Sequence, residues 1–305
     1  MPVGQQCAVY RHAAFGRAKG YSSRAVYEPN GQLPPSCVRQ FAIEQGLKIH
    51  DWPHSVPMNR YDVGIIVSFG HLIPPATIES FPWGMLNVHP SALPRWRGAA
   101  PVNHTILAGD THAAVTIMQI QPRFDVGPVL KQEIVPVPEN CMASKLRQQL
   151  AQKGAMMLVD CLEKLPSVVA NAKAQSKEGI TQAPKLTASM SAVNFCVNTK
   201  NDINIRYRAL SETFPLHCLW NREPVKLYNM LPLQQCDNLV VESGGEKPPG
   251  SSFYHKCRQL LCIKCKDGWV AFGGICPLGK KQMTAKEFYN GFLSKAKFNS
   301  VLFTT

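Results

Sequence analysis

The sequence predicts an α/β protein with a parallel sheet, followed by a smaller β-barrel domain. In the first half of the chain, segments with helical spacing of apolar residues alternate with short apolar runs, which is the pattern of βαβ units. In the last third, short strand-like segments alternate with glycine and proline turns, which is typical of a small barrel. Residues 171–195 lack a periodic apolar pattern and are expected to form a linker.

The elements of the first domain begin after Pro34. A short helix within 36–45 ends at Gly46, and a strand follows at 47–50. The run 61–70 is almost continuously apolar, which predicts a parallel strand buried on both faces. Further helices are expected at 75–80 and 100–107, and further strands at 85–89, 113–120 and 128–137, the last at the sheet edge because it is the least apolar.

Three helices are predicted in the rest of the chain. Leucines at helical spacing between residues 142 and 165 indicate a core-facing helix that Pro166 ends. Ile203, Tyr207 and Leu210 indicate an amphipathic helix after the linker. A capping box formed by Thr284 and Glu287 precedes a helix through 288–293. The expected divisions are a basic, disordered or transit-like segment 1–33, a first domain 34–170, the linker 171–195 and a β-barrel domain 196–305.

Composition restricts the class of protein. The chain has 305 residues, of which 45% are hydrophobic, so it is long enough to bury a sizeable core. No apolar run approaches the ~20 residues of a membrane helix, so a membrane span is excluded. The net charge of +13 favours a polyanionic partner, nucleic acid above all, although mitochondrial proteins are often basic for other reasons.

The cysteines and the basic terminus suggest an intracellular organelle. The 11 cysteines are scattered through apolar segments and are expected to be reduced. Cys262 and Cys265 form a CxxC pair, but no second pair completes a zinc site. The first thirty residues carry four cations against one acid and lack the apolar core of a secretory signal, which suits a transit peptide.

The segment LNVHPSALPRWRG, residues 86–98, carries the most chemistry. Asn87 and His89 stand two apart on a strand, so their side chains share one face beyond the carboxyl end of that strand. Asp125 follows the next strand and is expected at the same place. An amide donor, an imidazole and a carboxylate suit acyl-type transfer, in which an oxyanion develops and an amine loses a proton.

Each of these residues also has an ordinary structural interpretation. Asn87 can satisfy backbone groups at a strand end, His89 can be a packed imidazole, and Asp125 can form the turn before Gly127. Considered separately, the three residues leave both interpretations open. Their combined setting distinguishes between them.

The order LNVHPSALPRWRGAAPV, AAVTIMQI and FDVGPVL resembles the folate-dependent formyltransferases, over residues 34–165. The segments QAPKLTASMSAVNF, IRYRAL and KDGWVAF resemble the methionyl-tRNA formyltransferases, and YNGFL and Pro90 resemble their mitochondrial branch. The resemblance implies a Rossmann-like formyltransferase domain and an OB-like barrel domain. It also implies formyl transfer from 10-formyltetrahydrofolate to the amino group of methionyl-tRNA in the mitochondrial matrix, by a monomer without a metal.

The resemblance assigns roles to residues of this sequence. Asn87, His89 and Asp125 take the catalytic positions, with Asn87 and protonated His89 stabilising the oxyanion and Asp125 orienting His89. The formyl donor is expected to bind Phe69, Gly70, His71, Leu72, Ile73, Ser91, Leu93 and Pro94. Leu72, Ile73 and Leu93 are equally compatible with ordinary core positions.

Contacts with tRNA are expected from basic residues of both domains. Arg95, Trp96 and Arg97 suit the terminal adenosine or its phosphates, or else form a solvated rim. The second domain contributes Arg206, Arg208, Lys264, Lys266, Lys280 and Lys281, each of which is individually compatible with an ordinary surface charge.

One feature departs from the family pattern. The family begins with a further βαβ unit, and here only about thirty basic residues precede the matching segment, so we expect that first unit to be missing or replaced. Three functions follow: an active methionyl-tRNA formyltransferase, another folate-dependent formyltransferase or hydrolase acting on a small amine, and a catalytically impaired tRNA-binding protein.

Overall fold

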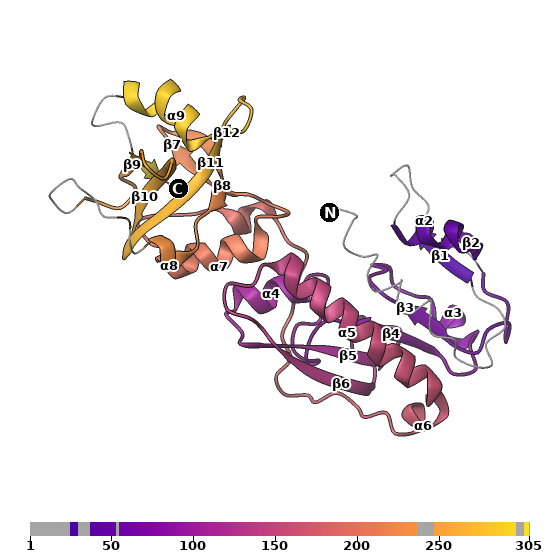
Figure 1. Ribbon diagram of the computed structural model, residues 1–305. Helices are drawn as coiled ribbons and strands as arrows, with labels where there is room; N and C mark the ends of the chain where they lie inside the picture. Colours follow the sequence, from indigo (N-terminus) through magenta and orange to yellow (C-terminus); the bar gives the residue numbers. More distant parts are fainter. Residues whose placement is uncertain are drawn as a thin grey trace. The chain divides into compact units, whose positions relative to one another are not determined.

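The computed structural model describes residues 25–29, 37–52, 55–236, 239, 247–296 and 302–304. The chain divides into two compact units, Met1–Lys185 and Leu186–Thr305, each with its own sheets (Figure 1). None of the described helices is long and apolar enough to cross a lipid bilayer.

A small parallel βαβ unit precedes the main sheet. Its elements are β1 (Ala25–Pro29), α2 (Cys37–Glu44) and β2 (Lys48–Trp52), and β1 pairs with β2. Gly46 has a φ of 63°, the left-handed conformation that ends a helix, as predicted. The segment 1–33, expected to be disordered or transit-like and to lack a βαβ unit, therefore contains β1. Its other residues lie outside the described part of the chain.

The main sheet of the first unit has the strand order β3-β4-β5-β6. The strands are β3 (Gly64–Ile66), β4 (Met85–His89), β5 (His112–Gln119) and β6 (Val129–Pro136), with helices α3 (Pro75–Glu79) and α4 (Pro101–Leu107) between them. β3 and β4 are parallel, as predicted, but β5 is antiparallel to both of its neighbours. The sheet is therefore mixed. The connection 120–128, which joins β5 to β6, is too short for a parallel crossover between these two strands, since such a crossover needs about a dozen residues or more.

Strand β3 is shorter and more exposed than its sequence predicts. The apolar run 61–70 indicates a strand buried on both faces, but only Gly64–Ile66 is extended, and Ile65 is 40% exposed. The reason is its position, because within the described chain β3 is an edge strand paired with β4 alone. β6 is the opposite edge, as predicted from its lower hydrophobicity.

Helix α5 (Ala143–Glu163) covers the sheet and confirms the predicted core-facing helix. It packs against β4, β5 and β6 (Figure 1). A side chain at Gly154 would come within 2.7 Å of Val88 Cγ1, so glycine lets the helix approach β4 closely. α6 (Leu165–Ala170) follows, with Pro166 in its first turn, where the missing N–H leaves no hydrogen bond unmade.

The segment 171–195, expected as a linker, is packed along much of its length. Lys173 pairs with Val129 of β6, and Gln182 forms a bridge with Arg97, both within the first unit. In the second unit Ser191, Val193 and Phe195 are buried.

The second unit is built on one seven-stranded sheet of order β13-β7-β8-β11-β10-β9, with β12 pairing β11. Its strands are β7 (Leu216–Trp220), β8 (Glu223–Met230), β9 (Ser252–His255), β10 (Leu260–Cys265), β11 (Gly268–Pro277), β12 (Met283–Thr284) and β13 (Phe303–Thr304). The Phe303 backbone N–H donates to the Gly250 carbonyl at 2.8 Å, which joins the strand at one edge to the segment entering β9 at the other. This contact closes the sheet into the predicted barrel.

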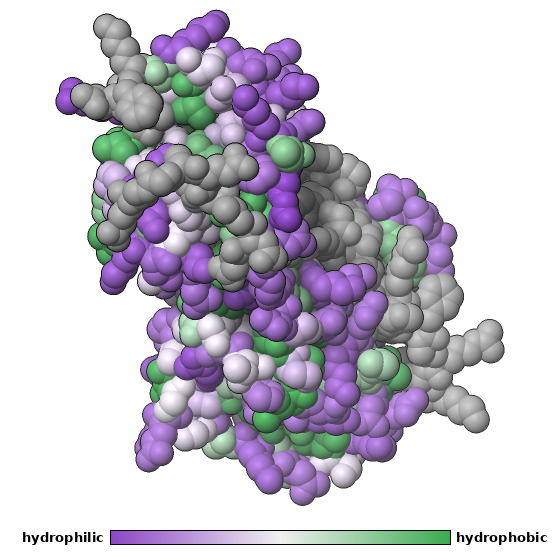
Figure 2. Space-filling view, turned by 60° about the vertical axis from the view of Figure 1, so that its left-hand side comes forward, coloured by the Kyte–Doolittle hydropathy of each residue, from purple (hydrophilic) through white to green (hydrophobic). Residues whose placement is uncertain are grey.

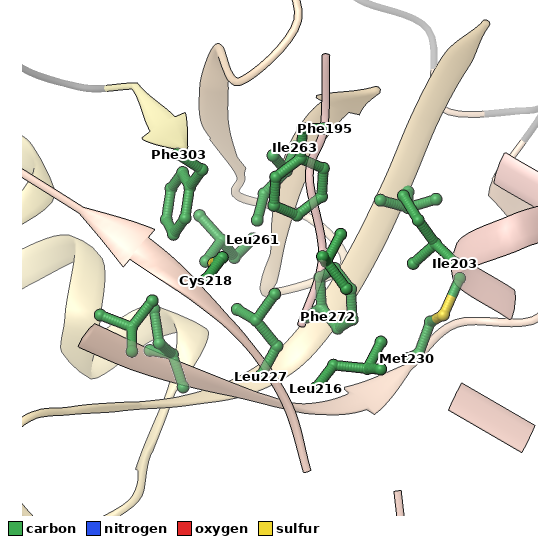
Figure 3. Close-up of a cluster of buried hydrophobic side chains, with 14 of the residues drawn as sticks. Phe195, Ile203, Leu216, Cys218, Leu227, Met230, Leu261, Ile263, Phe272 and Phe303 are labelled. Carbon is green, nitrogen blue, oxygen red and sulfur yellow. The ribbon is translucent and has the colours of Figure 1, made fainter. Parts of the chain in front are cut away.

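Apolar side chains from almost every strand fill the barrel. Figure 3 shows Phe195, Phe272 and Phe303 among the aliphatic residues of this cluster, and all three are fully buried. The helices of this unit are α7 (Lys200–Leu210), α8 (Leu233–Cys236) and α9 (Ala285–Gly291), with single 3₁₀ turns at η2 (Ala188–Ser191) and η3 (Leu293–Lys295). The predicted amphipathic helix is α7, and the predicted capping box of Thr284 and Glu287 begins α9.

A network of ion pairs joins β6 to α5 on the surface. Asp160 accepts from Lys131 at 2.8 Å and from Lys164 at 2.7 Å, and Lys131 also lies 3.1 Å from Glu133. The hydrogen bonds from Lys131 and Lys164 lower the pKa of Asp160 from 3.8 to about 2. The carboxylate therefore stabilises the fold above the unfolded-state pKa, and this contribution disappears as pH falls from about 4 to about 2.

We predict that Asp160→Asn lowers the urea midpoint of unfolding at pH 6, because two lysines lose their carboxylate. The difference from the parent chain should shrink steadily as pH falls below about 4. Urea unfolding from pH 6 to pH 2.5 measures it, with the exposed Glu163→Gln as the matched control. A constant difference across this pH range would contradict the interpretation.

Candidate active site

Strand β4 presents two polar side chains, Asn87 and His89, on one face of the sheet, because they stand two residues apart. Both are buried, with 8% and 4% of their surface exposed. Leu86 and Val88 point to the opposite face, where α5 packs. Among the described residues, none forms a hydrogen bond with the side-chain amide of Asn87. The donor and acceptor groups of this side chain are therefore available to a ligand.

His89 lies between two acceptors. Its Nδ1 is 3.6 Å from Asp125 Oδ1, an ion-pair distance, and its Nε2 is 3.0 Å from the carbonyl oxygen of Trp96. A protonated imidazole carries an N–H on each nitrogen and matches both acceptors, whereas a neutral ring can donate to only one of them. Each ring nitrogen of His89 therefore faces an acceptor oxygen.

The structure brings Asp125 to His89 by a route that the sequence does not indicate. β5 is antiparallel to β4, so its last residue, Gln119, lies beside Leu86 at the beginning of β4. The segment 120–128 must turn back across the sheet to carry Asp125 to the end of β4. Asp125 has a φ of 53°, a conformation that aspartate adopts more readily than most residues.

Gly127 allows this return. A Cβ atom there would lie 1.8 Å from the Gln119 carbonyl oxygen, which is backbone and cannot move aside. The Gly98 backbone N–H holds the loop from the other side by donating to Asp125 Oδ2 at 2.8 Å. Position 98 requires glycine, since its backbone has a φ of 121° and a Cβ would meet the Ala183 carbonyl oxygen at 2.7 Å.

Gln175 is a site residue that sequence reasoning missed. Its Nε2 donates to the carbonyl oxygens of Asp125 and Gly127, each at 2.9 Å, and its Oε1 accepts from Arg97. It lies fifty positions from Asp125 in a segment without a periodic pattern. The motif around Asp125 gave no signal that could have identified it.

The residues expected to bind the formyl donor fall into two groups. Phe69 packs edge-on against Trp52, with ring centroids 5.2 Å apart, and Ile73 is buried in the same small cluster. Gly70 has a φ of 77°, and His71 and Leu72 are exposed, Leu72 by 53%. Ile73 is thus a core residue, whereas His71 and Leu72 are accessible to a ligand.

Ser91, Leu93 and Pro94 form the loop directly after β4. Ser91 is buried, and its hydroxyl donates to the Arg95 carbonyl at 2.7 Å. Two side chains from the sheet hold this loop: Thr116 donates to the Ser91 carbonyl at 2.6 Å, and Gln132 donates to the Leu93 carbonyl at 3.0 Å. The loop that follows His89 is therefore held by side chains of β5 and β6.

Arg95 and Trp96 are occupied within the fold. Arg95 donates to both carboxylate oxygens of Asp110, at 2.9 and 2.7 Å, and the Trp96 indole donates to the same group at 2.8 Å. The hydrogen bonds that Arg95 donates to Asp110 raise the pKa of Arg95. Arg97 is likewise bonded to Gln175. Each of these three side chains, expected to contact tRNA, thus donates to a neighbouring side chain of the fold.

The basic residues of the second unit do not share one place in the structure, although Arg206 and Lys266 both lie close enough to Asp202 to help lower its pKa. Arg206 is half-buried and donates to the Met190 carbonyl at 2.8 Å, and Arg208 is half-buried on the same helix. Lys264 lies over the Trp269 ring, 5.8 Å from its centroid. The exposed Lys266 precedes β11, and the exposed Lys280 and Lys281 follow it, so they lie at opposite ends of this strand (Figure 1).

Cys262 and Cys265 do not face a common site. Cys262 packs in one apolar cluster and Cys265 in the barrel core, because residues three apart on a strand point to opposite faces. Burial raises the pKa of Cys262 to about 12. Within the described ranges, no group of three or more histidine, cysteine or acidic residues is placed to hold a metal ion.

Comparison with known families agrees with this geometry. The family model described as formyl transferase matches residues 38–162, and the model of the formyl transferase C-terminal domain matches residues 185–293. The methionyl-tRNA formyltransferase of Methylococcus capsulatus is 31% identical over 289 residues, which are 90% of this chain and 90% of that protein. The chain belongs to the methionyl-tRNA formyltransferase family.

Mitochondrial members of this family are more similar in sequence. The mitochondrial methionyl-tRNA formyltransferases of Bos taurus and Homo sapiens are 46% and 45% identical, each over 84% of this chain. The chain spans 65% and 66% of their lengths, which is slightly less than two thirds.

Solved structures confirm the predicted formyltransferase fold class. HypX from Aquifex aeolicus with tetrahydrofolic acid aligns with a TM-score of 0.61 at 16% identity, over 92% of this chain and 50% of that chain. An N-formyltransferase from Helicobacter canadensis aligns with a TM-score of 0.60 at 15% identity, over 91% of this chain and 95% of that chain.

We predict that Asp110→Ala lowers the free energy of unfolding by about 1–2 kcal/mol, because Arg95 and Trp96 lose a shared acceptor. Urea unfolding at neutral pH measures the change, with the exposed Asp62→Ala as control. Equal stabilities of the two variants would show that Asp110 does not hold this loop.

Proposed function

We propose that the chain transfers a formyl group from 10-formyltetrahydrofolate to the α-amino group of methionyl-tRNA and thereby makes the initiator formylmethionyl-tRNA. The observation that carries this proposal is the placement of Asn87 and His89 on one face of β4, with Asp125 of the 120–128 loop facing His89, in a chain of this family. Formation of formylmethionyl-tRNA from charged initiator tRNA and the formyl donor is the direct test.

The chemistry assigns each of the three residues a task. The neutral amine attacks the formyl carbon, a new C–N bond forms, and the carbonyl electron pair moves to oxygen. The Asn87 side-chain amide and the His89 ring stabilise this oxyanion, and Asp125 keeps the ring oriented. Collapse breaks the bond to the folate nitrogen, which takes a proton, and the amine proton passes to a base or to water.

The formyl donor is proposed to bind where two loops meet the end of β4. His71 and Leu72 supply accessible side chains beside Phe69, Gly70 and Ile73. The loop of Ser91, Leu93 and Pro94 supplies backbone that Thr116 and Gln132 hold by hydrogen bonds. The proposed mechanism uses no metal ion, because Asn87 and His89 are proposed to stabilise the oxyanion.

The tRNA is proposed to bind through exposed cations of the second unit, chiefly Lys266, Lys280 and Lys281, with Lys264 beside Trp269. Arg206 and Arg208 contribute to the local positive field from half-buried positions. The net charge of +13 supports a polyanionic partner. We further propose that the protein acts as a monomer in the mitochondrial matrix, since mitochondrial enzymes are among its most similar relatives.

We predict that Asn87→Ala lowers the rate of formyl transfer by about 10²–10³, the usual effect of losing one oxyanion donor. Single-turnover formylation of methionyl-tRNA measures the rate, and Asn103→Ala, a substitution of a buried asparagine on α4, serves as the control for packing. An unchanged rate in Asn87→Ala would overturn the proposed mechanism. Transfer to a small amine but not to tRNA would instead favour a different formyltransferase.

We predict that Lys280→Ala/Lys281→Ala weakens tRNA binding and reduces the slope of log K against log salt by about 2, because two phosphate contacts are lost. Filter binding of charged initiator tRNA at several salt concentrations measures the slope. Lys145→Ala, an exposed cation on α5, is the control. An unchanged slope would place the tRNA elsewhere.

A further inference from the structure

We propose that Gln175 is a positioning residue that fixes Asp125 opposite His89 by joining the 120–128 loop to the segment that follows β4. This inference rests on the proposed function, because it gives Gln175 a part in formyl transfer. It assigns a role to a side chain that touches neither His89 nor Asn87 and that acts through Asp125 alone.

The Gln175 carboxamide uses its full hydrogen-bonding capacity. Nε2 donates to the carbonyl oxygens of Asp125 and Gly127, both at 2.9 Å. Oε1 accepts from Arg97, from Nε at 3.1 Å and from Nη2 at 2.6 Å. An amide has two N–H donors and two acceptor positions, so no group is left over. The orientation of the amide follows from its partners: Nε2 must face the two carbonyl oxygens, and Oε1 must face the Arg97 guanidinium.

These contacts complete a closed ring made of hydrogen bonds and one covalent link, the peptide bond between Arg97 and Gly98. Gln175 holds the backbone of Asp125, Asp125 Oδ2 accepts from the Gly98 N–H at 2.8 Å, Gly98 follows Arg97 in the chain, and Arg97 returns to Gln175. Asp125 is therefore held by its main chain and by one carboxylate oxygen. Its remaining oxygen, Oδ1, faces His89 at 3.6 Å.

The segment that carries Gln175 is anchored on both sides of it. Lys173 exchanges two backbone hydrogen bonds with Val129, at 2.7 and 2.9 Å, and Ala183 donates to the Arg97 carbonyl at 2.7 Å. The amide is thus presented from a fixed backbone, so it can impose a position on the loop. A side chain on a free segment would only follow the loop.

Glutamine is the side chain that this position needs. Glutamate has the same length and still accepts from Arg97, but it replaces both donors with an oxygen facing two carbonyl oxygens. Asparagine keeps the donors and acceptors but is one methylene group shorter, so it cannot reach both partners at once. The two variants therefore weaken the same contact by different means.

The first test compares Gln175→Glu with Gln182→Glu, an exposed glutamine of the same segment. We expect kcat for formyl transfer to fall about 10- to 100-fold in Gln175→Glu, with KM for both substrates unchanged, because Asp125 leaves its place opposite His89. Gln182→Glu should behave as the parent chain. Gln175→Asn should show a smaller fall in the same direction.

A double-mutant cycle separates positioning from general packing. If Gln175 acts through Asp125, the Gln175→Glu change should cost little further activity in an Asp125→Asn background. If Gln175→Glu lowered activity by the same factor in the parent chain and in Asp125→Asn, the proposal would be overturned, because Gln175 would then act independently of the Asp125 carboxylate.

A third measurement needs no activity. Amide hydrogen exchange at Gly98, followed by NMR, should become about tenfold faster in Gln175→Glu, because the carboxylate that accepts from this N–H is released. Exchange at the buried Ile117 should not change. If the parent chain forms no formylmethionyl-tRNA, the proposed function fails while this exchange still decides the role of Gln175. Unchanged exchange at Gly98 would overturn the positioning role.

Discussion

The return of the 120–128 loop across the sheet is the constraint on which the candidate site depends. Strand pairing alone would leave Asp125 near the beginning of β4, because β5 ends beside Leu86. The loop reaches His89 only because Gly127 can lie against the Gln119 carbonyl and because donors from two other segments hold the carboxylate and its backbone. Placement of this carboxylate therefore depends on hydrogen bonds between side chains and main chain of three segments, and the sheet supplies only the histidine and the asparagine.

Local patterns in the sequence predicted local structure well. The period-two placement of Asn87 and His89, the leucine spacing of α5 and the capping box of Thr284 and Glu287 all depend on residues a few positions apart, and the structure has each of them. The antiparallel course of β5 was not predictable in this way, because strand direction depends on which partner lies alongside. The same holds for Gln175, whose partners lie about fifty and eighty positions away along the chain.

Charge counts carry even less positional information. A net charge of +13 favours an anionic partner, but Arg95, Trp96 and Arg97 each donate to a neighbouring side chain, and the exposed Lys266 lies at the opposite end of β11 from Lys280 and Lys281. Arginine is suited to such internal roles because its planar group can satisfy two acceptor positions at once. A loop of arginines and an aromatic residue can therefore serve to hold the fold together and not to bind nucleic acid. Which of the two roles applies here depends on Asp110, which lies outside the motif.

Closure of the barrel by Phe303 has a consequence for folding during synthesis on the ribosome. The strand that joins the two edges of the second unit is made after every other strand of that unit, so the sheet remains open while the preceding residues emerge. Open edges expose unpaired N–H and C=O groups that neighbouring chains can bind. The first unit, whose strands all precede residue 185, can fold while this continues. The edges of the second unit's sheet therefore stay unpaired until Phe303–Thr304 is translated.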